Sequence, residues 1–177
     1  FVVSMRRKDG SMAWQPTKLT IAEFEARVKS FPWSGHIKSF HVHHTADYHS
    51  NWKGAASVRS MREHHMKNRG MRDSAQHVTL APDGTVWLGR DWNWAPASAT
   101  GHNGHDDRDR PFMVETAGNF QGDVTHAPDI LQGPQRESLV RMIAAVQAHF
   151  GLPADAIAFH REFQATACPG KISKTEL

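Results

Sequence analysis

Segments with the spacing of an amphipathic helix alternate with short strand-like segments along this chain. Helical spacing runs over 20–31, 56–70 and 134–151, and strand-like residues occupy 38–44, 75–91, 111–120 and 156–160. The segment 75–91 has a Pro-Asp-Gly turn at its centre, which is typical of a β-hairpin. The order helix, strand, helix, hairpin, strand, helix, strand predicts an α/β domain with a mixed central β-sheet flanked by helices.

Length and composition fit a single globular domain. We expect a polar and basic lead segment at 1–17, followed by one domain over 18–177. No apolar run approaches the roughly 20 residues of a membrane span. The chain starts with Phe1 rather than Met, and we expect it to be a fragment or a processed product. The net charge of +3 favours polyanionic partners without choosing among them. No basic helix supports nucleic acid as the partner.

Histidine is unusually frequent and cysteine is nearly absent: the chain has 13 histidines and one cysteine. Two predicted strands end in histidine, at His43/His44 and at His160, and Cys168 follows His160 by eight residues in a turn before Pro-Gly. Two histidines and one thiolate suit zinc and leave one coordination position open, as in catalytic zinc sites. The same residues also fit a second interpretation, in which the thiol is an inert core residue and the histidines are hydrogen-bonded polar groups.

Four motifs occur in order between about residues 36 and 170: VHHTA at 42–46, QHVTLAPDGTVWLGRD at 76–91, VETAGNF at 114–120 and HREFQATACPG at 160–170. They resemble the type 2 N-acetylmuramoyl-L-alanine amidases, a superfamily that includes peptidoglycan recognition proteins and amidase-type phage lysozymes. The resemblance implies a recognition-protein-like fold and zinc-dependent cleavage of the amide between N-acetylmuramic acid and L-alanine of peptidoglycan. It also implies Zn²⁺ ligands at His43, rather than His44, and at His160 and Cys168.

The resemblance implies two further catalytic residues. The family stabilises the oxyanion from a position two residues before the last ligand, which here is Thr166, and a hydroxyl can donate to developing charge. A glutamate of the family acts as general base, and the matching stretch FMVE places Glu115 there. A surface salt bridge is the alternative role for Glu115.

Candidate substrate-binding residues lie at Gln76, Trp92, Trp94, His102 and Asn103. Gln76 stands where the recognition-protein branch has a tyrosine, and glutamine cannot act as an acid or base. Trp92 and Trp94 could stack on sugar faces of a glycan groove or pack in the ordinary way. The segment 104–111 is longer than the family loop, and we expect either substrate and partner contacts or a solvated loop.

Two classes of function follow. The first is a cell-wall amidase acting in the periplasm or outside the cell, as an endolysin, a remodelling enzyme or a delivered toxin with an immunity or regulatory protein as partner. The second is a peptidoglycan-binding recognition module without activity. Recognition proteins that lose the cysteine become binders, and Cys168 is present here, which favours the enzyme.

Overall fold

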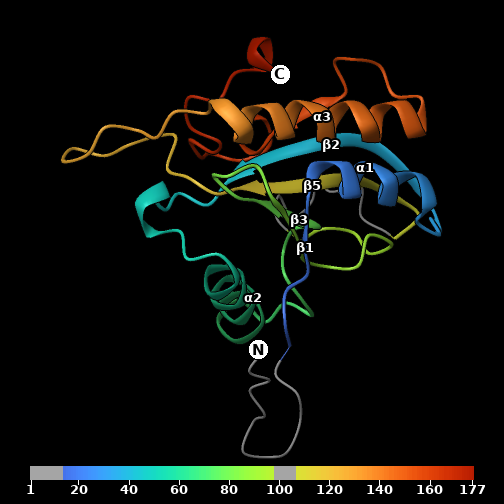
Figure 1. Cartoon of the computed structure of the whole chain (residues 1–177), viewed down its shortest axis with the longest axis horizontal. Coiled ribbons are helices and arrows are strands. Elements are labelled where there is room, and N and C mark those ends of the chain that lie inside the picture. Colours follow the sequence, from blue (N-terminus) through green and yellow to red (C-terminus); the bar gives the residue numbers. More distant parts are fainter. Residues whose placement is uncertain (1–13, 98–106) are drawn as a thin grey trace, which may run out of the picture.

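A central sheet lies between helices in the computed structural model, which describes residues 14–97 and 107–177 (Figure 1). Within these residues the sheet has six strands in the order β1-β4-β3-β5-β2-β6. Strand β2 is parallel to β5 and β6, and β3 is parallel to β5, whereas β4 is antiparallel to both β3 and β1. The predicted α/β fold with a mixed sheet is confirmed.

The described helices and strands have the following bounds: β1 Lys18–Leu19, α1 Ile21–Ser30, β2 His36–His44, η1 His49–Asn51, α2 Ala55–Arg69, β3 Val78–Leu80, β4 Val86–Leu88, β5 Asp109–Thr116, α3 Gly133–Phe150, β6 Ile157–Phe159, η2 His160–Glu162 and η3 Lys174–Glu176. None of the helices in the described ranges is long and apolar enough to cross a membrane.

Local signals account for the ends of the helices. Helix α1 begins with a complete capping box, in which the Thr20 hydroxyl accepts from the Glu23 N–H and the Glu23 carboxylate accepts from the Thr20 N–H. Helices α2 and α3 end at Gly70 and Gly151, which adopt left-handed backbone angles that close a helix without a Cβ clash. Helix α3 also has Pro134 in its first turn, where no N–H is needed.

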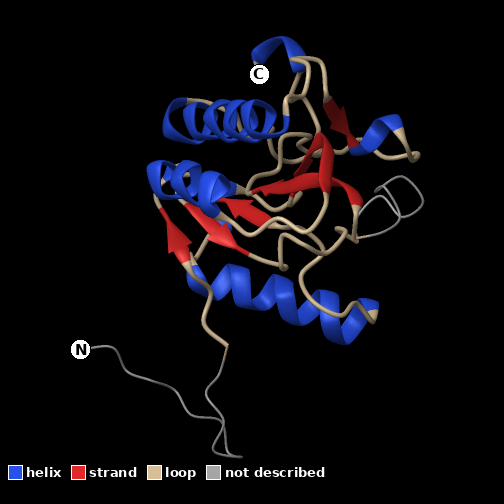
Figure 2. Ribbon diagram, turned by 90° about the vertical axis from the view of Figure 1, so that its right-hand side faces the viewer, coloured by secondary structure: helices blue, strands red, loops and turns tan. Residues whose placement is uncertain are grey.

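The two faces of the sheet differ in chemistry. Helices α1 and α3 cover one face, and α2 lies on the other (Figures 1 and 2). The face under α1 and α3 is apolar and its side chains are fully buried, including Phe40 and Val42 of β2 and Phe112 and Val114 of β5. Because side chains alternate along a strand, the intervening residues point to the α2 face.

The α2 face carries polar side chains. His41 and His43 of β2 lie beside Met113 and Glu115 of β5 in register, and Thr79 of β3 lies beside Glu115. The apolar cluster on this side is small, with Val58, Ala81 and Trp87 as its buried members. The apolar core on this side is therefore much smaller than the core under α1 and α3.

The structure differs from the sequence predictions in two places. Strand β5 begins at Asp109, two residues before the predicted strand at 111–120. The Arg110 guanidinium is buried there and donates to the Trp92 carbonyl at 2.9 Å. The folded part also starts before residue 18. The Thr17 carbonyl accepts from the Leu88 N–H at 2.9 Å, and the Arg62 guanidinium lies 4.6 Å from the ring of Trp14.

Candidate metal centre

Strand parity separates the two histidines at the end of β2. His43 lies on the α2 face beside Glu115, whereas His44 turns to the opposite face, where its Nδ1 accepts from the Phe120 N–H at 3.3 Å. Both histidines are buried. Only His43 therefore shares a face with the other predicted site residues.

The other two predicted ligands come from the end of β6 and the loop that follows it. His160 begins η2 directly after β6, and its Nε2 lies 3.0 Å from Gln164 Oε1. When Nε2 donates to that amide oxygen, the lone pair of the ring lies on Nδ1. The loop returns to the strand end because the Arg161 N–H donates to the Cys168 carbonyl at 3.0 Å.

The return of the loop depends on a glycine. Gly170 has φ of +72°, and a Cβ there would lie 2.4 Å from the carbonyl carbon of Phe120. No side chain fits at that approach without moving the backbone. The Cys-Pro-Gly sequence thus lets the loop pack closely enough to bring Cys168 to β2.

Three ligand atoms converge at this point. One donor atom from each of His43, His160 and Cys168 lies within 4.8 Å of the others, and the rings of His43 and His160 are 4.7 Å apart between centroids. The Sγ of Cys168 is 3.7 Å from Nδ1 of His43. In a tetrahedral zinc site, bonds of about 2.0–2.1 Å to nitrogen and about 2.3 Å to sulfur place these atoms about 3.6 Å apart. The spacing and the donor set therefore fit zinc.

The electrostatics of the trio also fit a cation. Burial lowers the pKa of His43 to about 3, so its ring is neutral and has a lone pair to donate. Its Nε2 is buried and has no hydrogen-bond partner among the described residues. Burial, and then the negative charge of Glu115, raise the pKa of Cys168 to about 12. Such a thiol keeps its proton at neutral pH unless a cation lies beside it, and a bound metal deprotonates it.

Glu115 and Thr166 lie next to this trio. Glu115 lies in β5 in register with His43, and burial raises its pKa to about 8. The Thr166 hydroxyl is exposed and accepts from the Cys168 N–H at 3.2 Å, which leaves its own hydrogen free to donate to another group. The two predicted catalytic residues thus come from different segments and meet around the same strand ends.

The prediction that Trp92 lines a glycan groove is wrong. Its side chain is 2% exposed and packs edge-on against Phe24 at 5.5 Å and against Phe112 at 5.2 Å. Trp94 is partly buried, and the Arg72 guanidinium covers its ring at 3.9 Å. The first indole belongs to the core, and the second has one face occupied by a cation.

Gln76 is not placed for direct substrate contact either. It is 1% exposed, and its amide donates to the Thr79 hydroxyl at 2.9 Å beneath α2. The neighbouring His77 is fully buried and stacks on Phe112 of the core. His102 and Asn103 lie outside the described residues, as do residues 104–106 of the 104–111 segment.

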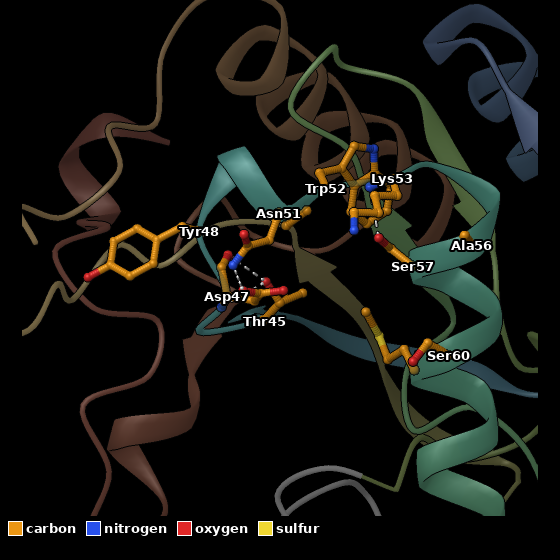
Figure 3. A pocket seen from close by; sticks show the side chains of 11 residues that line it. Thr45, Asp47, Tyr48, Asn51, Trp52, Lys53, Ala56, Ser57 and Ser60 are labelled. Atoms are coloured by element: carbon orange, nitrogen blue, oxygen red, sulfur yellow. Dashed lines mark hydrogen bonds between the residues drawn. The ribbon is translucent and has the colours of Figure 1, made fainter.

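Sequence reasoning missed a group of residues in the segment after β2. A cavity of about 550 Å³ lies there, beside the strand ends (Figure 3). Its lining includes Thr45, Asp47, Trp52, Lys53 and Met61. The one available signal was position, because loops that follow the carboxyl ends of parallel strands collect ligand-binding residues.

Comparisons with known proteins give the family of the chain and its structural relatives. The family model described as N-acetylmuramoyl-L-alanine amidase matches residues 33–171. A search of curated proteins gives no match. Among solved structures, the chain is similar to a point mutant of Drosophila PGRP-LB in complex with tracheal cytotoxin, at 23% identity and a TM-score of 0.63, with 81% of each chain covered.

Two further structures have the same fold. Bumblebee PGRP-SA is 22% identical, with 79% of each chain covered and a TM-score of 0.63. The Ph2119 endolysin from Thermus scotoductus MAT2119 bacteriophage Ph2119 is 19% identical, covers 79% of this chain and 81% of its own, and has a TM-score of 0.58. These likenesses concern the fold, which is that of the peptidoglycan recognition proteins. Since the family model spans most of the sequence, from just after α1 to the Cys-Pro-Gly turn, the chain belongs to the N-acetylmuramoyl-L-alanine amidase family.

Proposed function

We propose that this protein is a zinc-dependent amidase that hydrolyses the bond between N-acetylmuramic acid and L-alanine in peptidoglycan. The observation that carries the proposal is the convergence of His43, His160 and Cys168 from three segments of the chain. Three protein ligands leave one position open, which distinguishes a catalytic zinc from a structural one. Zn²⁺ held by this trio would supply Lewis acidity and lower the pKa of water.

The residues around the trio have separate roles in this proposal. Glu115 accepts a proton from the attacking water and returns it to the leaving amine of L-alanine. The Thr166 hydroxyl donates to the oxygen of the scissile carbonyl as negative charge develops there. His44 acts through Cys168, because its backbone N–H donates to the Sγ at 3.4 Å and so stabilises a thiolate.

The setting of the activity follows from the substrate. Peptidoglycan lies in the periplasm or outside the cell, and we propose that the protein acts there. One structural relative was solved with tracheal cytotoxin, and we propose that this chain also binds muropeptides of that kind. If the protein is a delivered toxin domain, an immunity or regulatory protein is its expected partner.

The test is digestion of purified peptidoglycan, with the soluble products identified by mass spectrometry. We expect free stem peptides that begin with L-alanine, lost when a chelator is added and restored by Zn²⁺. Cys168→Ala should release none and should bind less zinc by elemental analysis. Intact muropeptides from a wild-type protein that contains zinc and binds the wall would reject the amidase and support the recognition module.

A further inference from the structure

One exposed glutamine partners the ring of His160. Its Oε1 lies 3.0 Å from Nε2 of that ring, and within the described residues the ring makes no other hydrogen bond. The glutamine is Gln164, four residues further along the chain. Because His160 offers one of the three ligand atoms of the candidate metal centre, the state of that atom depends on this single contact.

The backbone holds the glutamine beside the histidine. The Gln164 N–H donates to the His160 carbonyl at 3.1 Å, and the Phe163 N–H donates to the same oxygen at 3.0 Å. On the far side, the Thr166 N–H donates to the Gln164 carbonyl at 2.8 Å. A turn of this kind places the side chains of its first and fifth residues next to each other, as on a helix. The amide therefore loses little further freedom when it meets the ring.

The chemistry of the amide oxygen decides where the proton of the ring lies. A carbonyl oxygen accepts a hydrogen bond and cannot donate one. It therefore favours the His160 tautomer with its proton on Nε2, which leaves the lone pair on Nδ1, the nitrogen that remains for a metal ion. In the other tautomer two lone pairs would face each other across the contact, and a proton would block Nδ1.

The other histidine of the trio is held in a different way. Nδ1 of His43 lies 3.7 Å from Sγ of Cys168, and its Nε2 has no hydrogen-bond partner among the described residues. Its ring is fixed by burial between strands, with 2% of the residue exposed. His160 is only partly buried, at the end of the edge strand β6. Of the two rings, His160 thus depends more on a hydrogen bond for its orientation.

We propose that Gln164 is a positioning residue that holds His160 with its Nδ1 lone pair ready for a metal ion, and this inference rests on the zinc site of the proposed amidase. Replacement of the group that accepts from the second nitrogen of a metal-bound histidine typically changes metal affinity by about 10–100-fold. Gln164 is exposed, and water can take its place in part, so we expect about tenfold, the lower end of that range.

The test measures two quantities: zinc affinity by chelator competition, and the tautomer of His160 by NMR of the ring nitrogens in the zinc-free protein at mildly alkaline pH. Gln164→Met keeps the length of the side chain and removes the acceptor. We expect it to bind zinc about tenfold more weakly and to show a mixture of tautomers. Gln164→Glu keeps an acceptor, and should keep the wild-type tautomer and bind zinc at least as tightly as wild type.

Two controls accompany these variants. Gln132→Met makes the same replacement at an exposed glutamine before α3 that has no capping hydrogen bond, and should match wild type in both measurements. The Arg161 guanidinium donates to the carbonyls of Gly170 and Ile172 at 2.6 and 2.9 Å, and so braces the loop just past Cys168. Arg161→Met should therefore weaken zinc binding and leave the His160 tautomer unchanged.

Three results would overturn the proposal. The first is a zinc affinity of Gln164→Met equal to that of wild type. The second is a weaker affinity with an unchanged tautomer, which would reduce Gln164 to a packing role. The third is a tautomer mixture in Arg161→Met as well, because loop packing rather than the amide oxygen would then set the tautomer.

Failure of the amidase proposal is distinguishable from these results. If wild type binds zinc but releases no stem peptides from peptidoglycan, the amidase is rejected. The zinc affinities and the NMR signals of the ring nitrogens still decide the role of Gln164, since neither measurement depends on turnover.

Discussion

Acid should destabilise this protein in part through a buried histidine, His77, that lies outside the candidate metal centre. His77 is fully buried, and its ring stacks on Phe112 at 4.9 Å between centroids. Its Nδ1 accepts from the Met113 N–H at 3.0 Å, and its Nε2 lies 2.8 Å from the Trp94 carbonyl, to which it can only donate. A second proton on Nδ1 would point at the Met113 N–H, and two donors would then face each other. The folded state therefore accommodates only the neutral ring. Burial accordingly lowers the pKa of His77 to about 3.

The size of the effect follows from linkage. In the unfolded chain the pKa of His77 returns to its ordinary value of about 6.5, so the unfolded state takes up a proton that the folded state refuses. The neutral His77 ring leaves the free energy of unfolding at its full value above about pH 6.5. That free energy falls as the pH falls from there towards about 3. At about pH 5 the difference is about 1.5 pH units, and at about 1.36 kcal/mol per unit this amounts to about 2 kcal/mol.

Urea unfolding at about pH 7.5 and about pH 5 measures this difference in wild type and in His77→Gln. The glutamine amide can accept and donate as the ring does, but it does not titrate in this range. We expect the free energy of unfolding of wild type to fall by about 2 kcal/mol more than that of the variant. Replacement of the exposed His149 by Gln serves as the control and should leave the acid loss unchanged. Equal acid loss in wild type and His77→Gln would refute the reasoning.

Four further predictions concern the site and its supports. Glu115→Gln should retain zinc by elemental analysis and lose turnover by about 10²–10⁴, and an unchanged kcat would move the general base elsewhere. Trp92→Ala should lower the free energy of unfolding by about 3–5 kcal/mol in urea titrations with KM unchanged, whereas a raised KM would restore it as a substrate contact. Gly170→Ala puts a Cβ 2.4 Å from the Phe120 backbone and should weaken zinc binding in chelator competition. A zinc affinity equal to that of wild type would contradict the view that Gly170 lets the loop bring Cys168 to β2. The Asp129 carboxylate accepts from the His49 N–H at 2.9 Å and from the Asn119 N–H at 2.8 Å, and so joins the two loops beside the cavity. Asp129→Ala should therefore raise KM several-fold with kcat within about twofold, and a loss confined to kcat would contradict this.

Local patterns predicted most of the fold. The capping box at Thr20 and the glycines after α2 and α3 determine helix ends through contacts within a few residues. Apolar residues alternate with histidines in β2, so Phe40 and Val42 lie on one face and His41 and His43 on the other. Such features depend on backbone geometry over a single turn or strand, which sequence spacing reports directly.

The edges of elements were harder to predict. Strand β1 has two residues and is recognisable only by its pairing with β4, which lies about 70 residues later. The start of β5 at Asp109 depends on the burial of Arg110, whose guanidinium finds acceptors in a distant loop. From sequence, a charged residue in a polar stretch is predicted to lie in a loop, because the acceptors that allow its burial are distant in the chain.

The sequence by itself determined the order of the longer elements, because periodicity is a local property of the chain. Its resemblance to a family indicated His43, His160 and Cys168 as the candidate ligands. Only the tertiary structure decided which aromatic and polar side chains are accessible. Trp92 and Gln76 stand in polar segments, yet α1 covers the first and α2 the second, since burial depends on segments far apart in sequence that pack together. The same packing leaves Asp47 and Lys53 on opposite sides of one cavity, a relation between charges that the short stretch of sequence joining them does not reveal.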